Sequence, residues 1–159
     1  MNQAGDYKLQ EILLHGPTGT IDIKSLMVEL NVYESIYANS IYGNMVIADT
    51  ANHIQNMPII GQEMLQFKFS TDDSPQNEEI DFTTHFARIY KVSDQVRTAE
   101  RQQVYTLNFT SKETVTDLRT SLNKIYKGSA DQIIQEVLQN NIRTTKSYKL
   151  EEATESLTL

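Results

Sequence analysis

The side chains best suited to acid–base or metal chemistry in this sequence are three histidines and a few carboxylates. His15, His53 and His85 fall in a predicted turn, loop and strand, and none has a second histidine or a carboxylate at a zinc-motif spacing such as His-Glu-x-x-His. Asp81 and His85 are four residues apart, which on one strand separates them by about 13 Å. That distance is too long for a direct acid–base pair, so the histidines predict surface or packing roles.

Two acidic pairs, Asp72-Asp73 and Glu78-Glu79, offer carboxylate oxygens of the kind that bind calcium. They lack the order of acidic residues and the final glutamate of a calcium loop, so a solvated, mobile loop over residues 71–79 is expected. The sequence also has no phosphate-binding loop, nucleophile elbow or dinucleotide fingerprint. We therefore expect no enzyme, with no catalytic, cofactor-binding or metal-ligating residue; a small hydrolase or metal enzyme is the minor alternative.

Composition favours one soluble domain, or one domain and the start of another. The 159 residues are 39% hydrophobic, with a mean hydropathy of -0.44, and no apolar run approaches the roughly 20 residues that span a bilayer. The polar start, residues 1–6, does not resemble a secretory signal. Because the chain has no cysteine, a disulfide framework and a thiolate nucleophile are excluded. These features predict a soluble protein without membrane insertion, cytoplasmic by default, and they leave the compartment open.

The net charge of -7 is unevenly distributed along the chain. Residues 1–85 carry -9, residues 86–127 carry +4 and residues 128–159 carry -2, counted from the 14 basic and 21 acidic residues. Such an asymmetry can orient head-to-tail assembly between copies, although it is also compatible with an unevenly solvated surface. A pI near 4.9 argues against tight binding to nucleic acid phosphates. An acidic wall past which DNA slides without binding remains open.

Alternation of apolar and polar residues predicts a mainly β fold. The clearest strand is residues 26–33, where Leu26, Val28, Leu30 and Val32 are expected on one face and Met27, Glu29, Asn31 and Tyr33 on the other. A turn over residues 39–44, which contains Gly43, leads into a strand over 45–48. These segments predict a long hairpin.

Five further strands are expected, at residues 7–14, 21–23, 63–70, 82–93 and 102–110. Leu65, Phe67 and Phe69 should share one face, as should Tyr105, Leu107 and Phe109. A turn over residues 15–20, an irregular connection over 53–60 and a charged loop over 94–101 are expected to join them.

The apolar period changes near residue 111, which predicts helices after the strands. Thr110 and Glu113 have the spacing of a capping box, and Val115, Leu118, Leu122 and Ile125 follow at helical intervals. Ser129 and Gln132 can cap a second helix containing Ile133, Ile134, Val137 and Leu138. The fold class is therefore mainly β with appended helices, as an antiparallel β-barrel or sandwich over residues 1–110 and a helical segment over 111–159.

Three tyrosines, Tyr33, Tyr37 and Tyr42, lie in or beside the predicted hairpin. Tyrosine is enriched at protein interfaces because its ring is apolar while its hydroxyl can keep a hydrogen bond when partly exposed to water. These residues are therefore interface candidates, with ordinary strand-face tyrosines as the alternative. The segment Pro58–Glu63 reads locally as a tight turn in which Gly61 supplies an unusual φ.

Several short segments together resemble the N-terminal part of baseplate hub proteins of contractile-tailed bacteriophages. The segments that carry the resemblance are the strand leading to Tyr33-Glu34-Ser35-Ile36, Tyr42-Gly43-Asn44, Met45–Asp49, Pro58–Glu63, Gln103–Glu113 and Tyr126-Lys127-Gly128. The similarity extends over most of the chain as a loose pattern of individually common pieces.

This resemblance implies a structural role in the virion tail baseplate. Such hubs are trimers in which each subunit supplies two barrels of the phage tail-tube type, giving a ring that joins the tail tube to the central spike. The implied partners are therefore further copies of the chain, favouring a trimer, the tail tube protein, the central spike and other baseplate proteins, and DNA passes through without specific binding. Residues 1–110 would form the first barrel, and residues 111–159 would lead towards a second domain that is absent or truncated here.

The resemblance also extends the interface candidates beyond the tyrosines, to positions near residues 34–36 and 58–63. The full set is Tyr33, Glu34, Ser35, Ile36, Tyr37, Tyr42, Pro58, Ile59, Gly61 and Glu63. A hexameric ring protein of the tail-tube type and an unrelated all-β binding module are the alternative functions.

Overall fold

The computed structural model describes residues 7–50, 52–71, 79–100, 102–153 and 156–158. The chain divides into two compact units, Met1–Lys112 and Glu113–Leu159. The first is mainly β and the second contains the longest helix of the described residues.

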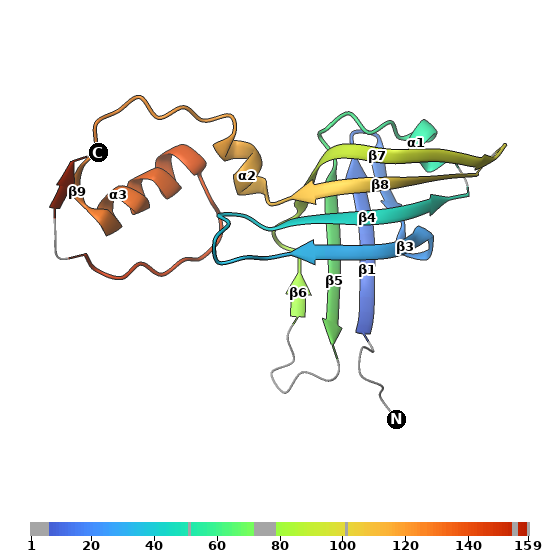
Figure 1. Ribbon diagram of the computed structural model, residues 1–159, viewed down its shortest axis with the longest axis horizontal. Helices are drawn as coiled ribbons and strands as arrows, with labels where there is room; N and C mark the ends of the chain where they lie inside the picture. The colour runs from blue at the N-terminus through green and yellow to red at the C-terminus, as the bar shows by residue number, and fades with distance from the viewer. Residues whose placement is uncertain (1–6, 51, 72–78, 101, 154–155, 159) are drawn as a thin grey trace. The chain divides into compact units, whose positions relative to one another are not determined.

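The first unit contains one antiparallel sheet with two short helices in its connections (Figure 1). Its strands are β1 (Tyr7–Gly16), β2 (Gly19–Asp22), β3 (Met27–Tyr33), β4 (Tyr42–Asp49), β5 (Met64–Thr71), β6 (Glu79–Asp81), β7 (Ala87–Ala99) and β8 (Gln102–Thr110), and its helices are the 3-10 helix η1 (Lys24–Leu26) and α1 (His53–Asn56). The strand order is β2-β1-β5-β7-β8-β4-β3, with β6 paired to β5. The eight-stranded sheet is not closed, and the predicted mainly β fold is confirmed.

The sheet folds into two layers at the short pairing between β5 and β7. Strands β5 and β7 pair only at Met64 with Arg88 and at Leu65 with Ala87. Beyond that junction the four-stranded layer (β7, β8, β4 and β3) runs across the β1–β5 layer (β2, β1, β5 and β6), as Figure 1 shows. Crossed layers of this kind enclose one apolar interior between their inner faces.

The core lies between the two layers. Leu65 and Phe67 of β5 are fully buried, as are Leu107 and Phe109 of β8, which confirms the two predicted apolar faces. The rings of Phe67 and Phe109 meet edge to face across the layers, with centroids 5.4 Å apart. Aromatic and aliphatic side chains from both layers thus fix the fold of the first unit.

Strand β3 departs from the predicted alternation because of a β-bulge. Met27 pairs with Ile47 and Glu29 with Val46, so Val28 is an extra residue without a partner on β4. Val28 is 64% exposed, whereas Met27 packs against the core. The prediction that Val28 shares the buried face of Leu30 is therefore wrong, although the predicted hairpin of β3 and β4 is confirmed.

Gly43 lies in strand β4 and is not a turn residue, contrary to the sequence prediction. It pairs with Val32 and Phe109 and is buried. A Cβ atom here would lie 2.2 Å from Cζ of Phe109 and 2.6 Å from the carbonyl oxygen of Asn31. The glycine is needed for the close approach of this ring, and the actual connection between β3 and β4 covers residues 34–41.

The second hairpin, β7 and β8, is longer than predicted. Strand β7 begins only at Ala87 and continues through the charged segment to Ala99, so the predicted loop over residues 94–101 is wrong. Three irregularities in register along β7 admit extra residues while pairing continues. Asp94 adopts a left-handed φ of 53° at one of them. Residues 72–78, the core of the predicted acidic loop, lie outside the described residues.

The second unit contains one continuous 13-residue helix. Its elements are α2 (Lys112–Asp117), which begins at the boundary, β9 (Lys127–Ser129), α3 (Ala130–Glu136), the π-helix η2 (Val137–Ile142) and β10 (Ser156–Thr158). The capping box predicted for Ser129 and Gln132 is confirmed, since Gln132 Oε1 accepts the Ser129 N–H at 3.3 Å and the Ser129 side chain accepts a backbone N–H. Strands β9 and β10 pair antiparallel.

Helix α2 starts where the sequence predicted but ends early. Leu118 N–H still reaches Thr114 O at 3.0 Å, after which the Arg119 and Thr120 N–H groups bond three residues back. The predicted continuation to residue 125 is wrong, and Leu118 and Ile125 are 83% and 71% exposed. Thr120, Ser121 and Asn123 weaken a helix at this point, because their side chains compete for backbone hydrogen bonds.

Candidate interface

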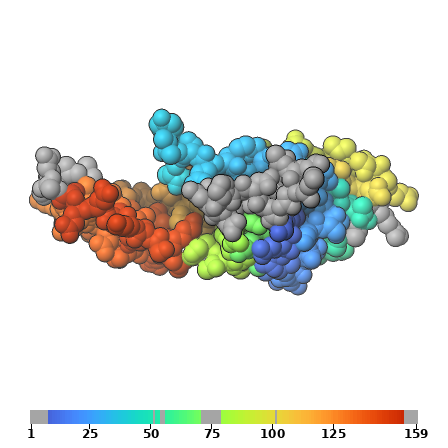
Figure 2. Space-filling view, turned by 90° about the horizontal axis from the view of Figure 1, so that it is seen from below, coloured from blue at the N-terminus to red at the C-terminus, as the bar shows by residue number. Residues whose placement is uncertain are grey.

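The connection between β3 and β4, together with the strand residues Tyr33 and Tyr42 at its base, forms an exposed aromatic surface, here called the tyrosine loop (residues 33–42). Ile36 is 92% and Tyr37 94% exposed at its tip, and Tyr33 and Tyr42 are 56% and 39% exposed at its base. Figure 2 shows this loop, in light blue, standing out from the surface of its unit. Large apolar side chains gathered on one protruding loop are typical of a protein contact.

Ser35 shapes the tip of the tyrosine loop. Its hydroxyl accepts the Tyr37 N–H at 3.2 Å, and its carbonyl accepts the Ala38 N–H at 3.1 Å. These bonds close a turn that uses local polar groups in place of core packing. Ile36 and Tyr37 therefore extend outward, and Glu34 beside them is exposed as well.

The base of the loop is fixed to the sheet. Tyr33 lies opposite Tyr42, and Asn44 Nδ2 lies 3.4 Å from the Tyr33 hydroxyl. On the other side, the Ile41 carbonyl accepts from Thr110 Oγ1 at 3.0 Å and from Ser111 N at 3.3 Å. The loop thus projects from an ordered base.

The segment Pro58–Glu63 is organised around the buried carboxylate of Glu63. Oε1 accepts the Ile60 N–H at 2.9 Å, and Oε2 accepts the N–H groups of Gly61 at 2.9 Å and Gln62 at 3.1 Å. Gly61 has a φ of 89°, which favours glycine. Glu63 is fully buried, so its carboxylate supports the loop from within and is not on the surface.

The exposed residues of this second segment are Pro58, Ile60, Gly61 and Gln62, whereas Ile59 packs against the core. The Ile60 side chain is 63% exposed. Ile60 was not among the predicted candidates, because the apolar run of residues 57–60 gives no sign of which isoleucine faces outward.

Register relates the two candidate segments. Met64, Arg88, Thr110, Tyr42 and Tyr33 form one transverse row across β5, β7, β8, β4 and β3. The tyrosine loop and the Pro58–Glu63 segment therefore lie at the same end of the sheet. Three strand spacings, about 14 Å, separate Tyr42 from Met64. The two segments therefore lie at the same end of the sheet without direct contact along this row.

The outer face of the four-stranded layer is mostly polar. Asn31, Asn44, Asn108 and Lys91 form a second transverse row. Asn31 Nδ2 donates to Asn44 Oδ1 at 3.0 Å, and Asn108 Nδ2 donates to the Ser93 hydroxyl at 3.0 Å. Apart from Lys91 at the β7 edge, the residues of this row offer hydrogen bonds through uncharged amide side chains.

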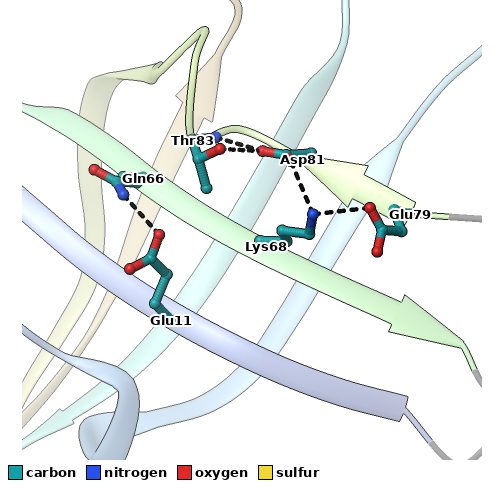
Figure 3. A network of polar contacts seen from close by, with 6 residues as sticks. All are labelled: Glu11, Gln66, Lys68, Glu79, Asp81 and Thr83. Carbon is teal, nitrogen blue, oxygen red and sulfur yellow. Dashed lines mark hydrogen bonds and ion pairs between the residues drawn. The ribbon is translucent and has the colours of Figure 1, made fainter.

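A polar network lies on the outer face of the β1–β5 layer (Figure 3). Lys68 Nζ lies 2.8 Å from a carboxylate oxygen of Glu79 and 3.1 Å from one of Asp81. Asp81 also accepts from Thr83, through the hydroxyl at 2.6 Å and the backbone N–H at 2.8 Å. These bonds from Thr83, followed by the contact with Lys68, lower the pKa of Asp81 to about 2. The network joins β5, β6 and the following turn.

The three histidines lie at separate points of the first unit. His15 lies in a chain of hydrogen bonds, with Nδ1 2.8 Å from Thr20 Oγ1 and Nε2 2.8 Å from Gln66 Oε1, and its ring stacks on Phe86. His53 opens α1. His85 follows β6 in the connection to β7, so its predicted position in a strand is wrong.

Over the described ranges, no group of three or more His, Cys, Asp or Glu side chains is placed to hold a metal ion. Within the same ranges, no helix has the length and apolar character needed to cross a membrane.

Comparison with known proteins gives no assignment for the chain. No protein-family model matches it, and no curated protein matches it.

Proposed function

We propose that this protein is a structural component of a contractile phage tail baseplate hub, forming a ring that joins the tail tube to the central spike. The observation that carries the proposal is that the four-stranded layer has a free strand edge on each side. Within the described pairings, β3 pairs only with β4, and β7 from Tyr90 to Ala99 pairs only with β8. Unpaired edges attract other strands unless they are covered.

The strand directions favour a ring in which the β3 edge of one copy meets the β7 edge of the next. Strands β7, β8, β4 and β3 alternate in direction, so β3 and β7 run in opposite directions. Adding β7 of a second copy beside β3 therefore continues the antiparallel alternation with both copies in the same orientation. Repetition of one head-to-tail contact gives a closed ring when the rotation between copies divides a full turn, and an open filament when it does not.

Charge supports this pairing of unlike edges. The β3 edge and its loop carry exposed Glu29 and Glu34, whereas the β7 edge carries exposed Lys91 and Arg97. Asp94 also lies on β7, with its carboxylate bonded to the Ser93 hydroxyl at 2.8 Å. Opposite charges favour the head-to-tail contact, and like charges disfavour contacts between two β3 edges.

The interface residues in this proposal are those of the tyrosine loop, followed by the exposed part of the Pro58–Glu63 segment. The ring is a virion component assembled in the host cytoplasm, and it binds the tail tube protein and the central spike. DNA passes through without specific binding. The role is structural, with no catalysis and no cofactor.

The solution mass of the purified chain, measured by light scattering over a range of concentrations, tests the proposal. A concentration-dependent trimer is expected for a hub. A hexamer would favour the tail-tube type of ring. A monomer at every concentration would contradict ring formation and favour an all-β binding module, for which the exposed tyrosines would be the contact surface for a different protein.

A further inference from the structure

The second unit carries a largely exposed segment between α2 and β9, in which Tyr126 is buried. This basic–apolar segment (residues 118–127) begins where α2 ends and reaches the start of β9. Leu118, Leu122 and Ile125 are 83%, 47% and 71% exposed. Three large aliphatic side chains exposed within eight residues form a surface that gains from burial against a partner.

The charge of this segment is uniformly positive. It contains Arg119, Lys124 and Lys127, and the chain has no Asp or Glu from residue 118 to residue 130. Lys124 pairs with Glu136 and lies 5.1 Å from the centre of the Tyr126 ring. Among the residues that the structure describes, Arg119 and Lys127 form no ion pair, and both are exposed. The segment therefore fits an acidic partner with apolar side chains.

The tyrosine loop has this complementary character. The chain has no Lys or Arg from residue 25 to residue 67. Glu34 is exposed beside Ile36 and Tyr37, and the Glu29 carboxylate lies on the neighbouring edge strand. Apolar side chains surrounded by charges of opposite sign on the two surfaces favour association and penalise like-charged pairings.

We propose that the tyrosine loop of one copy docks on the basic–apolar segment of the next copy. This inference rests on the proposed ring and on the opposite charges and exposed apolar side chains of the two surfaces.

Cysteine cross-linking tests this contact directly, because the chain has no native cysteine. Ile36→Cys and Leu122→Cys each introduce one thiol at an exposed position, and the two variants are mixed and treated with a short bismaleimide. We expect a cross-linked dimer at least about tenfold faster than for either variant alone. Thr18→Cys, at the exposed turn between β1 and β2, replaces Ile36→Cys in the control mixture and should give only the background rate.

The double variant Ile36→Cys/Leu122→Cys separates the possible occupants of the segment. A ladder of cross-linked chains that stops at a closed ring supports docking between copies. A cross-link within one chain would show that the segment is occupied by the loop of its own chain, which overturns the inference.

Sedimentation velocity on the same samples distinguishes the two proposals. If the chain forms an oligomer but cross-links only at the background rate, the docking contact is overturned and the proposed ring stands. If the chain is a monomer and does not cross-link, the docking contact and the ring are both overturned.

Exchanging the charges of Glu34 and Arg119 tests the contact independently, through the strength of association. Glu34→Arg and Arg119→Glu should each weaken association about tenfold, and the chain carrying both changes should recover most of the loss. No recovery in the double variant, with both single variants folded, would contradict the proposed pairing of these two surfaces.

Discussion

Tyr33 of β3 lies directly opposite Tyr42 of β4, and both rings belong to one face of the hairpin at the base of the tyrosine loop. The two side chains are 56% and 39% exposed. Cross-strand aromatic pairs stiffen a hairpin, so the loop beyond them presents Ile36 and Tyr37 from a defined position. This pair connects the fold of the four-stranded layer to the surface that we assign to assembly.

Replacing Tyr37 with serine should weaken self-association without changing the stability of the monomer. The ring is 94% exposed, so its loss removes no packing from the core, whereas tyrosines at interfaces often contribute about 2 kcal/mol or more. Sedimentation velocity should show association weakened by at least about tenfold, with an unchanged melting temperature. Tyr148→Ser, at an exposed position outside the loop, is the control. Equal association of Tyr37→Ser and the unmodified chain would contradict the assignment.

Replacing Val28 with lysine should block the β3 edge. Val28 is the extra residue of the bulge and is 64% exposed, so the change should alter the free energy of unfolding by less than about 0.5 kcal/mol. Lysine on an edge strand prevents pairing with another strand, and we expect a monomer by light scattering. Thr18→Lys adds the same charge at an exposed turn and should associate normally. Persistent assembly of Val28→Lys would show that β3 is not an interface edge.

Replacing Glu63 with alanine should destabilise the first unit. Three backbone N–H groups, those of Ile60, Gly61 and Gln62, would lose their acceptor in a buried site. Such a loss costs about 3 kcal/mol, measurable by urea denaturation followed by circular dichroism. Glu63→Gln retains one acceptor oxygen and should lose less. A change below about 1 kcal/mol for Glu63→Ala would show that the segment holds its conformation without the carboxylate.

The bonds to Asp81 predict a pH-dependent contribution to stability. Its pKa is lowered to about 2 by Thr83 and Lys68, below the value of about 3.9 in an unfolded chain. A carboxylate with a lowered pKa stabilises the fold fully above pH 4, and that contribution is lost as the pH falls through 2.

Thr83→Val removes the hydroxyl donor to Asp81. Because Asp81 is partly exposed, we expect the variant to be less stable by about 0.5–1 kcal/mol at pH 6. The difference should shrink between pH 4 and pH 2 in urea denaturation. Thr84→Val, at the exposed neighbouring position, should show no difference, and a deficit in Thr83→Val that does not depend on pH would contradict this origin.

Much of the fold could be predicted from the sequence where the apolar pattern is simple. The faces of β5 and β8 follow strict alternation, and Ser129 with Gln132 marks the start of α3. The prediction failed at Val28 because a bulge shifts the alternation by one residue, and bulges leave no clear sign in the order of apolar residues. It failed at Gly43 because the residue that requires a glycine there is Phe109, which is distant in the sequence.

The candidate site could be predicted only in part. The tyrosines indicated a surface, and Tyr33, Tyr37 and Tyr42 are indeed exposed. A tight-turn pattern does not show that Glu63 is buried and Ile60 exposed, because the turn folds around the Glu63 carboxylate. The free edge of β7 was also missed, since its charged residues suggested a loop.

Electron microscopy of the purified full chain in negative stain tests ring formation most directly. We predict class averages of closed rings with rotational symmetry and a central opening, which Val28→Lys abolishes and Thr18→Lys leaves unchanged. Open chains of variable length, pairs related by a twofold axis, or single particles at all concentrations would contradict the account that unlike edges of the four-stranded layer close a ring.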